Sequence, residues 1–119
     1  MDDTHRREFQ ALLDDREAEA HRRLADADAA LAEVSEARGD GVADDEHDPE
    51  GVPLSAEWTM VRSRQQDTIA ELAAIAAARV RMDAGEYGVC IDCGRAIPVA
   101  RLRARPFATR CVACEERAH

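Results

Sequence analysis

Two closely spaced pairs of cysteines constrain the fold of this chain more than any other feature of its sequence. Cys90 and Cys93 are separated by two residues. Cys111 and Cys114 have the same spacing, and seventeen residues lie between the two pairs. Such a spacing lets both thiolates of a pair reach one ion, and two pairs complete a tetrahedral site with zinc–sulfur distances of about 2.3 Å. Gly94 follows the first pair directly and suits a tight turn, because glycine readily adopts positive φ. We therefore predict one structural Zn²⁺ ion whose four positions are all filled by sulfur.

Spacing alone leaves iron open as an alternative to zinc. A thioredoxin-like redox pair is the weaker alternative, because such a pair lies beside a βαβ pattern and this sequence has none. The composition also favours a metal, since alanine supplies 24 of the 119 residues and there are only four aromatic ones. A cysteine segment this poor in large apolar side chains needs an ion to fold, so we expect metal binding and folding to be coupled. The four aromatic residues are Phe9, Trp58, Tyr87 and Phe107.

Two long runs of residues with apolar side chains at alternating three and four spacings precede the cysteines. This is the heptad pattern of a coiled-coil seam. The first run covers about residues 4–38 and has one gap, at Glu17; its seam is Leu13, Ala20, Leu24, Ala27, Leu31 and Val34. The second run is unbroken and consists of Leu54, Trp58, Val61, Gln65, Thr68, Leu72, Ile75, Arg79 and Met82. Gln65 and Thr68 make a polar layer midway, of the kind that fixes register at some cost in stability. We predict that Trp58 packs in the seam.

The ends of these runs predict where the helices begin and end. Gly39 and Gly41 are expected to end the first helix. Ser55, which follows Pro53, is the predicted N-cap of the second helix, and Gly85 is its predicted end. Two heptad helices of similar length joined by one loop form an antiparallel hairpin. Pairing of these helices with another chain is the alternative.

The predicted fold is therefore mostly α. Residues 1–84 form a long antiparallel coiled-coil hairpin with an acidic tip loop at residues 39–54. Residues 85–119 form a small four-cysteine zinc-finger module with a short C-terminal helix. We expect the protein to be a monomer.

The net charge of −9 is unevenly distributed along the chain. Residues 39–54 carry six acids and no base, whereas residues 85–119 carry six arginines and four acids. Crowded carboxylates repel one another, so an acidic loop is unfavourable unless a cation, a basic surface or water screens it. The loop is therefore either a solvated turn or the working part of the protein.

Several functional classes are excluded by the same composition. No segment approaches the roughly 20 apolar residues of a membrane span. The N-terminal residues also lack the apolar region of a secretory signal, so we expect a cytoplasmic protein with no membrane partner. The acidic balance argues against general affinity for the nucleic-acid backbone. We expect no enzymatic activity, because the sequence offers no nucleophile–base pair and its metal site is closed.

The cysteine segment resembles the zinc finger of the DksA/TraR family. The pattern of that family is G-x-Y-G-x-C-x-x-C-G-x-x-I-x-x-x-R-L-x-A-x-P-x-A-x-x-C-x-x-C. Every fixed position is matched over about a quarter of the chain, by Gly85, Tyr87, Gly88, Cys90, Cys93, Gly94, Ile97, Arg101, Leu102, Ala104, Pro106, Ala108, Cys111 and Cys114. The heptad runs extend the resemblance to most of the chain.

The resemblance implies a transcription regulator that inserts a coiled coil into the secondary channel of bacterial RNA polymerase. It implies that an acidic tip lies near the catalytic centre, without contact to a promoter sequence. The tip motif of the family is D-x-x-D-x-A, and its nearest match here is Asp45 and Asp48, with Glu50 in place of the alanine.

The basic residues of the cysteine segment are candidates for contact with an acidic rim of polymerase. They are Arg95, Arg101, Arg103, Arg105 and Arg110. The alternative is that Arg101 pairs locally with helix acids and the others are solvated. Two other functions remain open for the whole chain, a zinc-dependent DNA-binding module and a coiled-coil adaptor between proteins.

Overall fold

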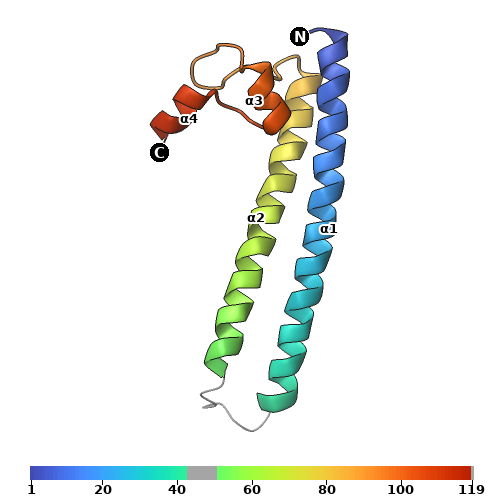
Figure 1. Cartoon of the computed structure of the whole chain (residues 1–119), viewed down its shortest axis with the longest axis vertical. Helices are drawn as coiled ribbons and strands as arrows, with labels where there is room; N and C mark the ends of the chain where they lie inside the picture. Colours follow the sequence, from blue (N-terminus) through green and yellow to red (C-terminus); the bar gives the residue numbers. More distant parts are fainter. Residues whose placement is uncertain (43–50, 119) are drawn as a thin grey trace. The chain divides into compact units, whose positions relative to one another are not determined.

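The structure is a computed structural model that describes residues 1–42 and 51–118, with side chains described for residues 1–35 and 56–118. The described residues form four helices (Figure 1). They are α1 (Asp3–Val42), α2 (Gly51–Asp83), α3 (Val99–Ala104) and α4 (Val112–Ala118). The described residues form no strand, and an isolated antiparallel bridge joins Val89 and Ala96. The predicted mostly α fold with a short C-terminal helix is confirmed. None of the described helices has an apolar stretch that would cross a membrane.

Two predicted helix ends are wrong. Helix α1 continues through Gly39 and Gly41 to Val42. Helix α2 begins at Gly51, so Ser55 lies inside the helix instead of capping it. The physical reason is that each glycine costs a helix only about 1 kcal/mol, and the good helix formers Glu36, Ala37 and Arg38 lie directly before Gly39. A proline in the first turn removes an N–H that would have no partner within the helix.

The end of α2 is as predicted. Gly85 has a φ of +77°, a conformation that L side chains rarely adopt. Its amide donates to the carbonyl of Met82 at 3.1 Å, and the amide of Glu86 donates to the carbonyl of Arg81 at 2.8 Å. This pair of bonds is the Schellman motif, which satisfies the last carbonyls of a helix and turns the chain away from its axis.

The chain divides into two compact units. One unit comprises Met1–Ala18 and Leu72–His119, and the other comprises Glu19–Glu71. The division follows spatial contacts, whereas the boundary between residues 84 and 85 concerns sequence modules and stays a prediction.

In the unit Glu19–Glu71, segments of α1 and α2 lie side by side and antiparallel (Figure 1). Arg23 forms an ion pair with Glu71, and the side-chain amide of Gln65 donates to Asp28 at 2.8 Å. The later of the two α1 residues thus meets the earlier of the two α2 residues, which confirms antiparallel pairing here. The heptad prediction is confirmed as well, because the buried members among the described side chains of this unit belong to the predicted seams: Ala20, Ala27, Val34 and Thr68.

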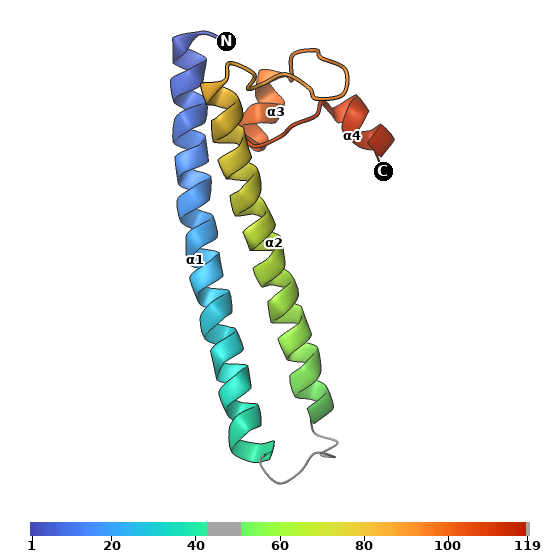
Figure 2. The same ribbon diagram turned by 180° about the vertical axis from the view of Figure 1, so that it is seen from behind.

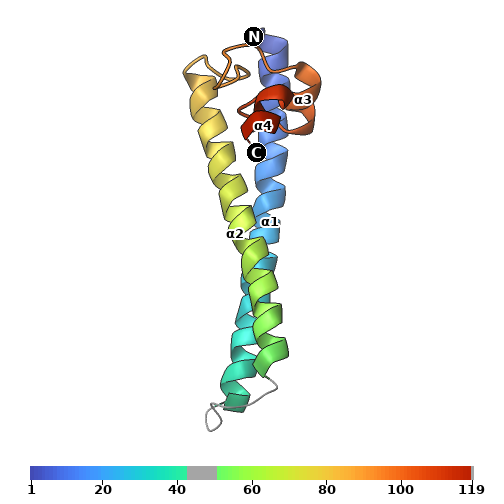
Figure 3. The same ribbon diagram turned by 90° about the vertical axis from the view of Figure 1, so that its left-hand side faces the viewer.

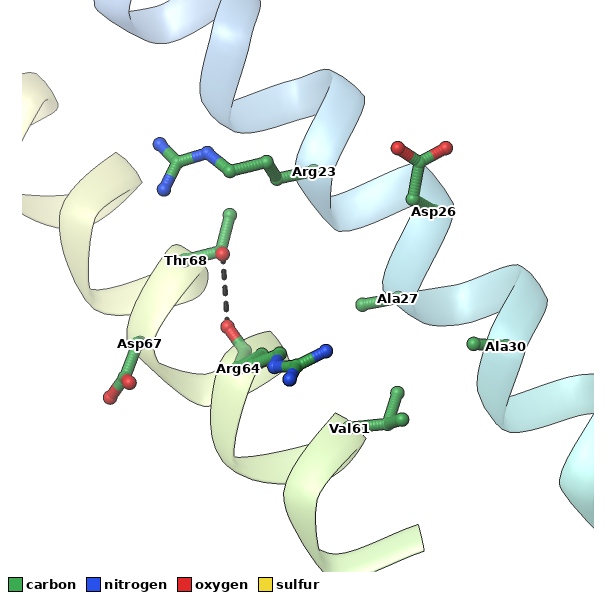
Figure 4. Close-up of a pocket in the computed structure, with 8 residues that line it drawn as sticks. All are labelled: Arg23, Asp26, Ala27, Ala30, Val61, Arg64, Asp67 and Thr68. Atoms are coloured by element: carbon green, nitrogen blue, oxygen red, sulfur yellow. Dashed lines mark hydrogen bonds between the residues drawn. The ribbon is translucent and has the colours of Figure 1, made fainter. Parts of the chain in front are cut away.

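A groove of about 480 Å³ lies between the two helices of this unit (Figure 4). Ala27 and Ala30 of α1 and Val61 of α2 line it, and these side chains are too small to fill the space between the helices. The guanidinium of Arg64 extends toward the gap, whereas the carboxylate of Asp67 points away (Figure 4). The ion pair and the hydrogen bond between the helices therefore supplement a seam of few large apolar side chains.

The predicted polar layer gives a first test of this seam. Thr68 is buried, and its hydroxyl donates to the carbonyl of Arg64 at 2.9 Å (Figure 4). The carbonyl of Arg64 is also positioned to accept the backbone amide of Thr68, the usual i→i−4 bond of a helix. Thr68→Val therefore removes a buried hydroxyl and leaves this carbonyl with a donor. We expect a gain of about 0.5–1 kcal/mol in the free energy of unfolding, measured with urea on the zinc-loaded chain. Ser63→Ala on the exposed face of α2 is the control and should change nothing measurable. A loss of stability in the valine variant would contradict this account of the seam.

In the unit formed by Met1–Ala18 and Leu72–His119, one core joins the helices to the cysteine segment. Arg103 of α3 forms an ion pair with Glu8 of α1 at 2.7 Å, and α3 lies beside the first turns of α1 (Figure 3). Leu102 of α3 belongs to the same buried core as Met82 near the end of α2, and Figure 2 shows this unit from behind. The buried members of the core come from α1, from α2 and from the cysteine segment: Phe9, Leu13, Ile75, Ala78, Met82, Tyr87, Cys90, Ile97, Leu102, Ala108 and Cys114.

Candidate metal centre

The first cysteine pair lies on a tight turn. The amide of Gly94 donates to the carbonyl of Cys90 at 3.0 Å, and the amide of Cys90 donates to the carbonyl of Arg95 at 2.8 Å. Gly94 has a φ of +74°, as its position after the pair predicted. These bonds fold the backbone back on itself, so that both sulfurs of the pair face one point.

The second cysteine pair lies at the start of α4. Cys111 precedes the helix and Cys114 lies in its first turn, and the amide of Glu115 donates to the carbonyl of Cys111 at 2.9 Å. The two pairs are tied together by the amide of Ile91, which donates to the carbonyl of Thr109 at 2.9 Å. A turn and a helix start therefore present two sulfurs each to a common centre.

The four sulfurs lie within 4.8 Å of one another, and those of Cys93 and Cys111 are 3.9 Å apart. A tetrahedron with zinc–sulfur bonds of about 2.3 Å places its sulfurs about 3.8 Å apart, so the spacing fits one Zn²⁺ ion. The cysteines are free thiols and form no disulfide. Cys90 and Cys114 are buried, and Cys93 is exposed. The centre thus has a buried side within the core and a side open to solvent.

The two buried thiols have opposite tendencies to ionise. Backbone N–H donors, first of all those of Cys93 and Cys111, lower the pKa of Cys90 to about 6. The hydrogen bond with the Cys111 thiol, followed by burial, raises the pKa of Cys114 to about 12. Four thiols this close cannot all ionise without a cation, because each new thiolate repels the others. Metal binding must therefore displace protons from this cluster, most of all from Cys114.

Arginines border the sulfur cluster and match the charge of an occupied site. Four thiolates and one Zn²⁺ carry a net charge of −2. Arg117 donates to the sulfur of Cys114 at 3.0 Å. Arg81 lines the same small pocket as Cys90, and its Nη1 is buried with no hydrogen-bond partner among the described residues. A dianionic site nearby accounts for a cation held in such a place, so the charge around the centre also fits zinc.

The arginines predicted to contact polymerase differ in what their side chains touch. Arg101 donates to the backbone carbonyl of Arg110 at 2.8 Å, whereas the alternative raised by the sequence paired it with helix acids. Arg103 makes that pairing instead, with Glu8. Arg105 lies over the ring of Phe107, with its guanidinium carbon 5.3 Å from the ring centroid.

The remaining predicted positions have different surroundings. Arg95 is exposed, and the guanidinium of Arg110 pairs with Asp92 at 2.7 Å. Trp58, predicted to pack in the seam, is half-buried and lies under the guanidinium of Arg62, 5.1 Å from the ring centroid. The candidate tip acids, Asp45 and Asp48, lie outside the described residues.

Comparison with known proteins identifies the cysteine segment. Residues 85–118 match the family model of the prokaryotic dksA/traR C4-type zinc finger. These residues are similar to that zinc finger over their whole length, and we call them the dksA/traR finger. A stretch of 27 residues is also 59% identical to an uncharacterized protein of Haemophilus influenzae, covering 23% of this chain and 36% of that protein. The chain therefore spans about a third of the length of this relative.

A solved structure resembles the whole chain in fold. Transcription factor DksA2 from Pseudomonas aeruginosa matches with a TM-score of 0.80 at 23% sequence identity. The match covers 99% of this chain and 85% of that one. At this identity the likeness describes the fold, in which the dksA/traR finger accompanies two long helices.

The dksA/traR finger uses residues that its cysteine spacing does not reveal. Phe9 is fully buried in the core of the finger, and its ring centroid is 5.7 Å from that of Tyr87. The buried hydroxyl of Tyr87 donates to the carbonyl of Pro106 at 2.6 Å and so has a hydrogen-bond partner. Phe9 stands one position off the alternating heptad seam but four residues before Leu13, a helical spacing that would have placed both on one face. Arg117 stands three residues after Cys114, a helical spacing that would have placed it beside the sulfur.

Proposed function

We propose that this protein is a non-enzymatic regulator of transcription that binds bacterial RNA polymerase through its secondary channel. The dksA/traR finger at residues 85–118 is the observation that carries the proposal. The fold likeness to a transcription factor supports it. An ion held by four thiolates has no open position for water or substrate, which supports a structural role for the metal.

In this proposal the working group is the acidic loop. Asp45 and Asp48 act near the catalytic centre of polymerase, where cations screen their charge. The antiparallel helices of the unit Glu19–Glu71 support such a role, because they hold the two ends of the loop next to each other. The protein acts as a cytoplasmic monomer and recognises no DNA sequence of its own.

The arginines of the finger face polymerase to different degrees. Arg95 and Arg105 are exposed and form no ion pair within the described part of the chain, so we propose them as direct contacts. Arg101 and Arg103 are tied to Arg110 and Glu8, and they act by holding α3 in place.

The double substitution Asp45→Asn with Asp48→Asn tests the mechanism. We expect the zinc-loaded variant to be retained by immobilised core polymerase as well as the wild-type chain, because most of the contact area is unchanged. Its effect on transcription in vitro should be lost, since the carboxylates that act at the centre are gone. Glu19→Gln with Glu33→Gln removes the same charge from an exposed face of α1 and should retain the effect.

Each alternative function predicts a different result in these assays. A DNA-binding module would bind duplex DNA without polymerase, with an affinity that falls steeply as salt rises. An adaptor for another protein would not be retained by core polymerase at all. A tip variant that regulates transcription like the wild type would refute the role of Asp45 and Asp48.

A further inference from the structure

The sulfur of Cys114 has a charged hydrogen-bond donor from outside the cysteine pairs. Arg117 lies in α4, three residues after Cys114 and on the same face of the helix. Its Nη2 is 3.0 Å from the sulfur. Cys114 is 3% exposed, so the guanidinium lies at the edge of the core beside a sulfur that solvent scarcely reaches. Hydrogen bonds with a charged donor or acceptor are shorter and stronger than neutral ones.

The other buried sulfur, that of Cys90, has hydrogen-bond donors of a different kind. The sulfur of Cys90 accepts hydrogen bonds from the backbone N–H groups of Cys93 and Cys111. The fixed positions of the zinc-finger pattern supply such backbone donors, and the pattern ends at Cys114. Arg117 therefore provides by a side chain what the turn provides by its backbone.

We propose that Arg117 is a positioning residue of the metal centre, which donates a hydrogen bond to the metal-bound thiolate of Cys114 and thereby slows loss of the ion. An occupied site carries a net charge of −2, and a guanidinium beside one sulfur offsets part of it. The bond withdraws electron density from the sulfur and keeps it oriented toward the metal. Partners outside the ligand set commonly change metal affinity by about 10–100-fold in this way.

A simpler role for Arg117 is to complement the dipole at the C-terminal end of α4, where it is the basic residue of the last turn. That role needs a positive charge but no contact with sulfur. Lysine retains the charge, and its single ammonium lacks the planar fork of the guanidinium. The variants Arg117→Gln and Arg117→Lys therefore separate the two roles.

The test measures the rate at which the full zinc-loaded chain transfers zinc to an excess of a coloured chelator. We expect Arg117→Gln to release zinc about tenfold faster than the wild type, and Arg117→Lys to remain faster than the wild type. Arg95→Gln, which removes an exposed arginine from the turn after Cys93, should leave the rate unchanged. Far-ultraviolet circular dichroism of the zinc-loaded variants establishes that α4 is retained.

A second readout reports on the sulfur itself. In the cobalt-substituted chain, loss of a hydrogen bond to a thiolate raises the energy of the sulfur electrons. The sulfur-to-cobalt charge-transfer band should therefore move to longer wavelength in Arg117→Gln and stay in place in Arg95→Gln.

The opposite results would overturn the proposal. One is an unchanged rate of zinc release in Arg117→Gln. The other is a wild-type rate of zinc release in Arg117→Lys together with an unmoved cobalt band in Arg117→Gln. Neither readout involves polymerase, so this inference stands or falls separately from the proposed function.

Discussion

Replacing Cys90 with serine will abolish tight zinc binding and unfold the core that surrounds the finger. Cys90 is 1% exposed and supplies one of the four sulfurs, and a serine hydroxyl does not ionise to replace it. A structural zinc site contributes about 10–16 kcal/mol, which matches or exceeds the net stability of about 5–15 kcal/mol of a typical domain. Zinc content after gel filtration gives the first measurement, and amide hydrogen exchange at Phe9 and Ile75 gives the second. Both residues should lose protection, because they belong to the same core.

Ala108→Ser is the matched control for this substitution. Ala108 belongs to the same buried core but supplies no ligand, so the variant adds a hydroxyl while all four sulfurs stay in place. We expect it to bind one zinc ion per chain. Tight zinc binding by Cys90→Ser with unchanged exchange at Phe9 would mean that the metal does not organise this core.

Replacing Phe9 with alanine will cost about 3–5 kcal/mol of unfolding free energy, the usual cost of truncating a buried phenylalanine. Phe9 is 0% exposed, and its ring lies against that of Tyr87 and close to the side chains of the shared core. Truncation removes this apolar surface and leaves a cavity that the surrounding backbone cannot close. Urea unfolding of the zinc-saturated chain measures the change.

Met60→Ala provides the comparison for Phe9. Met60 is 57% exposed on α2, so its truncation should shift stability by less than about 0.5 kcal/mol. If the two variants lose similar stability, Phe9 does not anchor α1 to the finger.

The cysteine spacing and the heptads predict much of this structure because each depends on residues close together in sequence. Two residues between cysteines determine which sulfurs share an ion, and Gly94 and Gly85 turn the chain by their own backbone conformations. The heptad runs predicted which faces pair, because a period of three and four places one stripe on one face of a helix. The single loop between two helices of similar length predicted that they are antiparallel. Ala20 and Thr68 accordingly lie buried within their unit.

The features that escaped prediction depend on residues distant in sequence or on small energies. Phe9 packs on Tyr87, and Arg103 pairs with Glu8, although each pair is far apart along the chain. No periodicity links such positions. The ends of the helices were not predicted because they depend on small energies. The cost of each glycine is smaller than the gain from continuing a helix.

The core that α1 and α2 share with the cysteine segment limits how the finger can be transplanted. Cys90 and Cys114 belong to the same buried core as Phe9 and Ile75, which the segment 85–118 does not contain. A chimaera that carries this segment alone would expose the apolar side of its metal centre to water. A protein engineer who moves the finger to another pair of helices must therefore bring Met1–Ala18 and the end of α2 with it, as a single cassette.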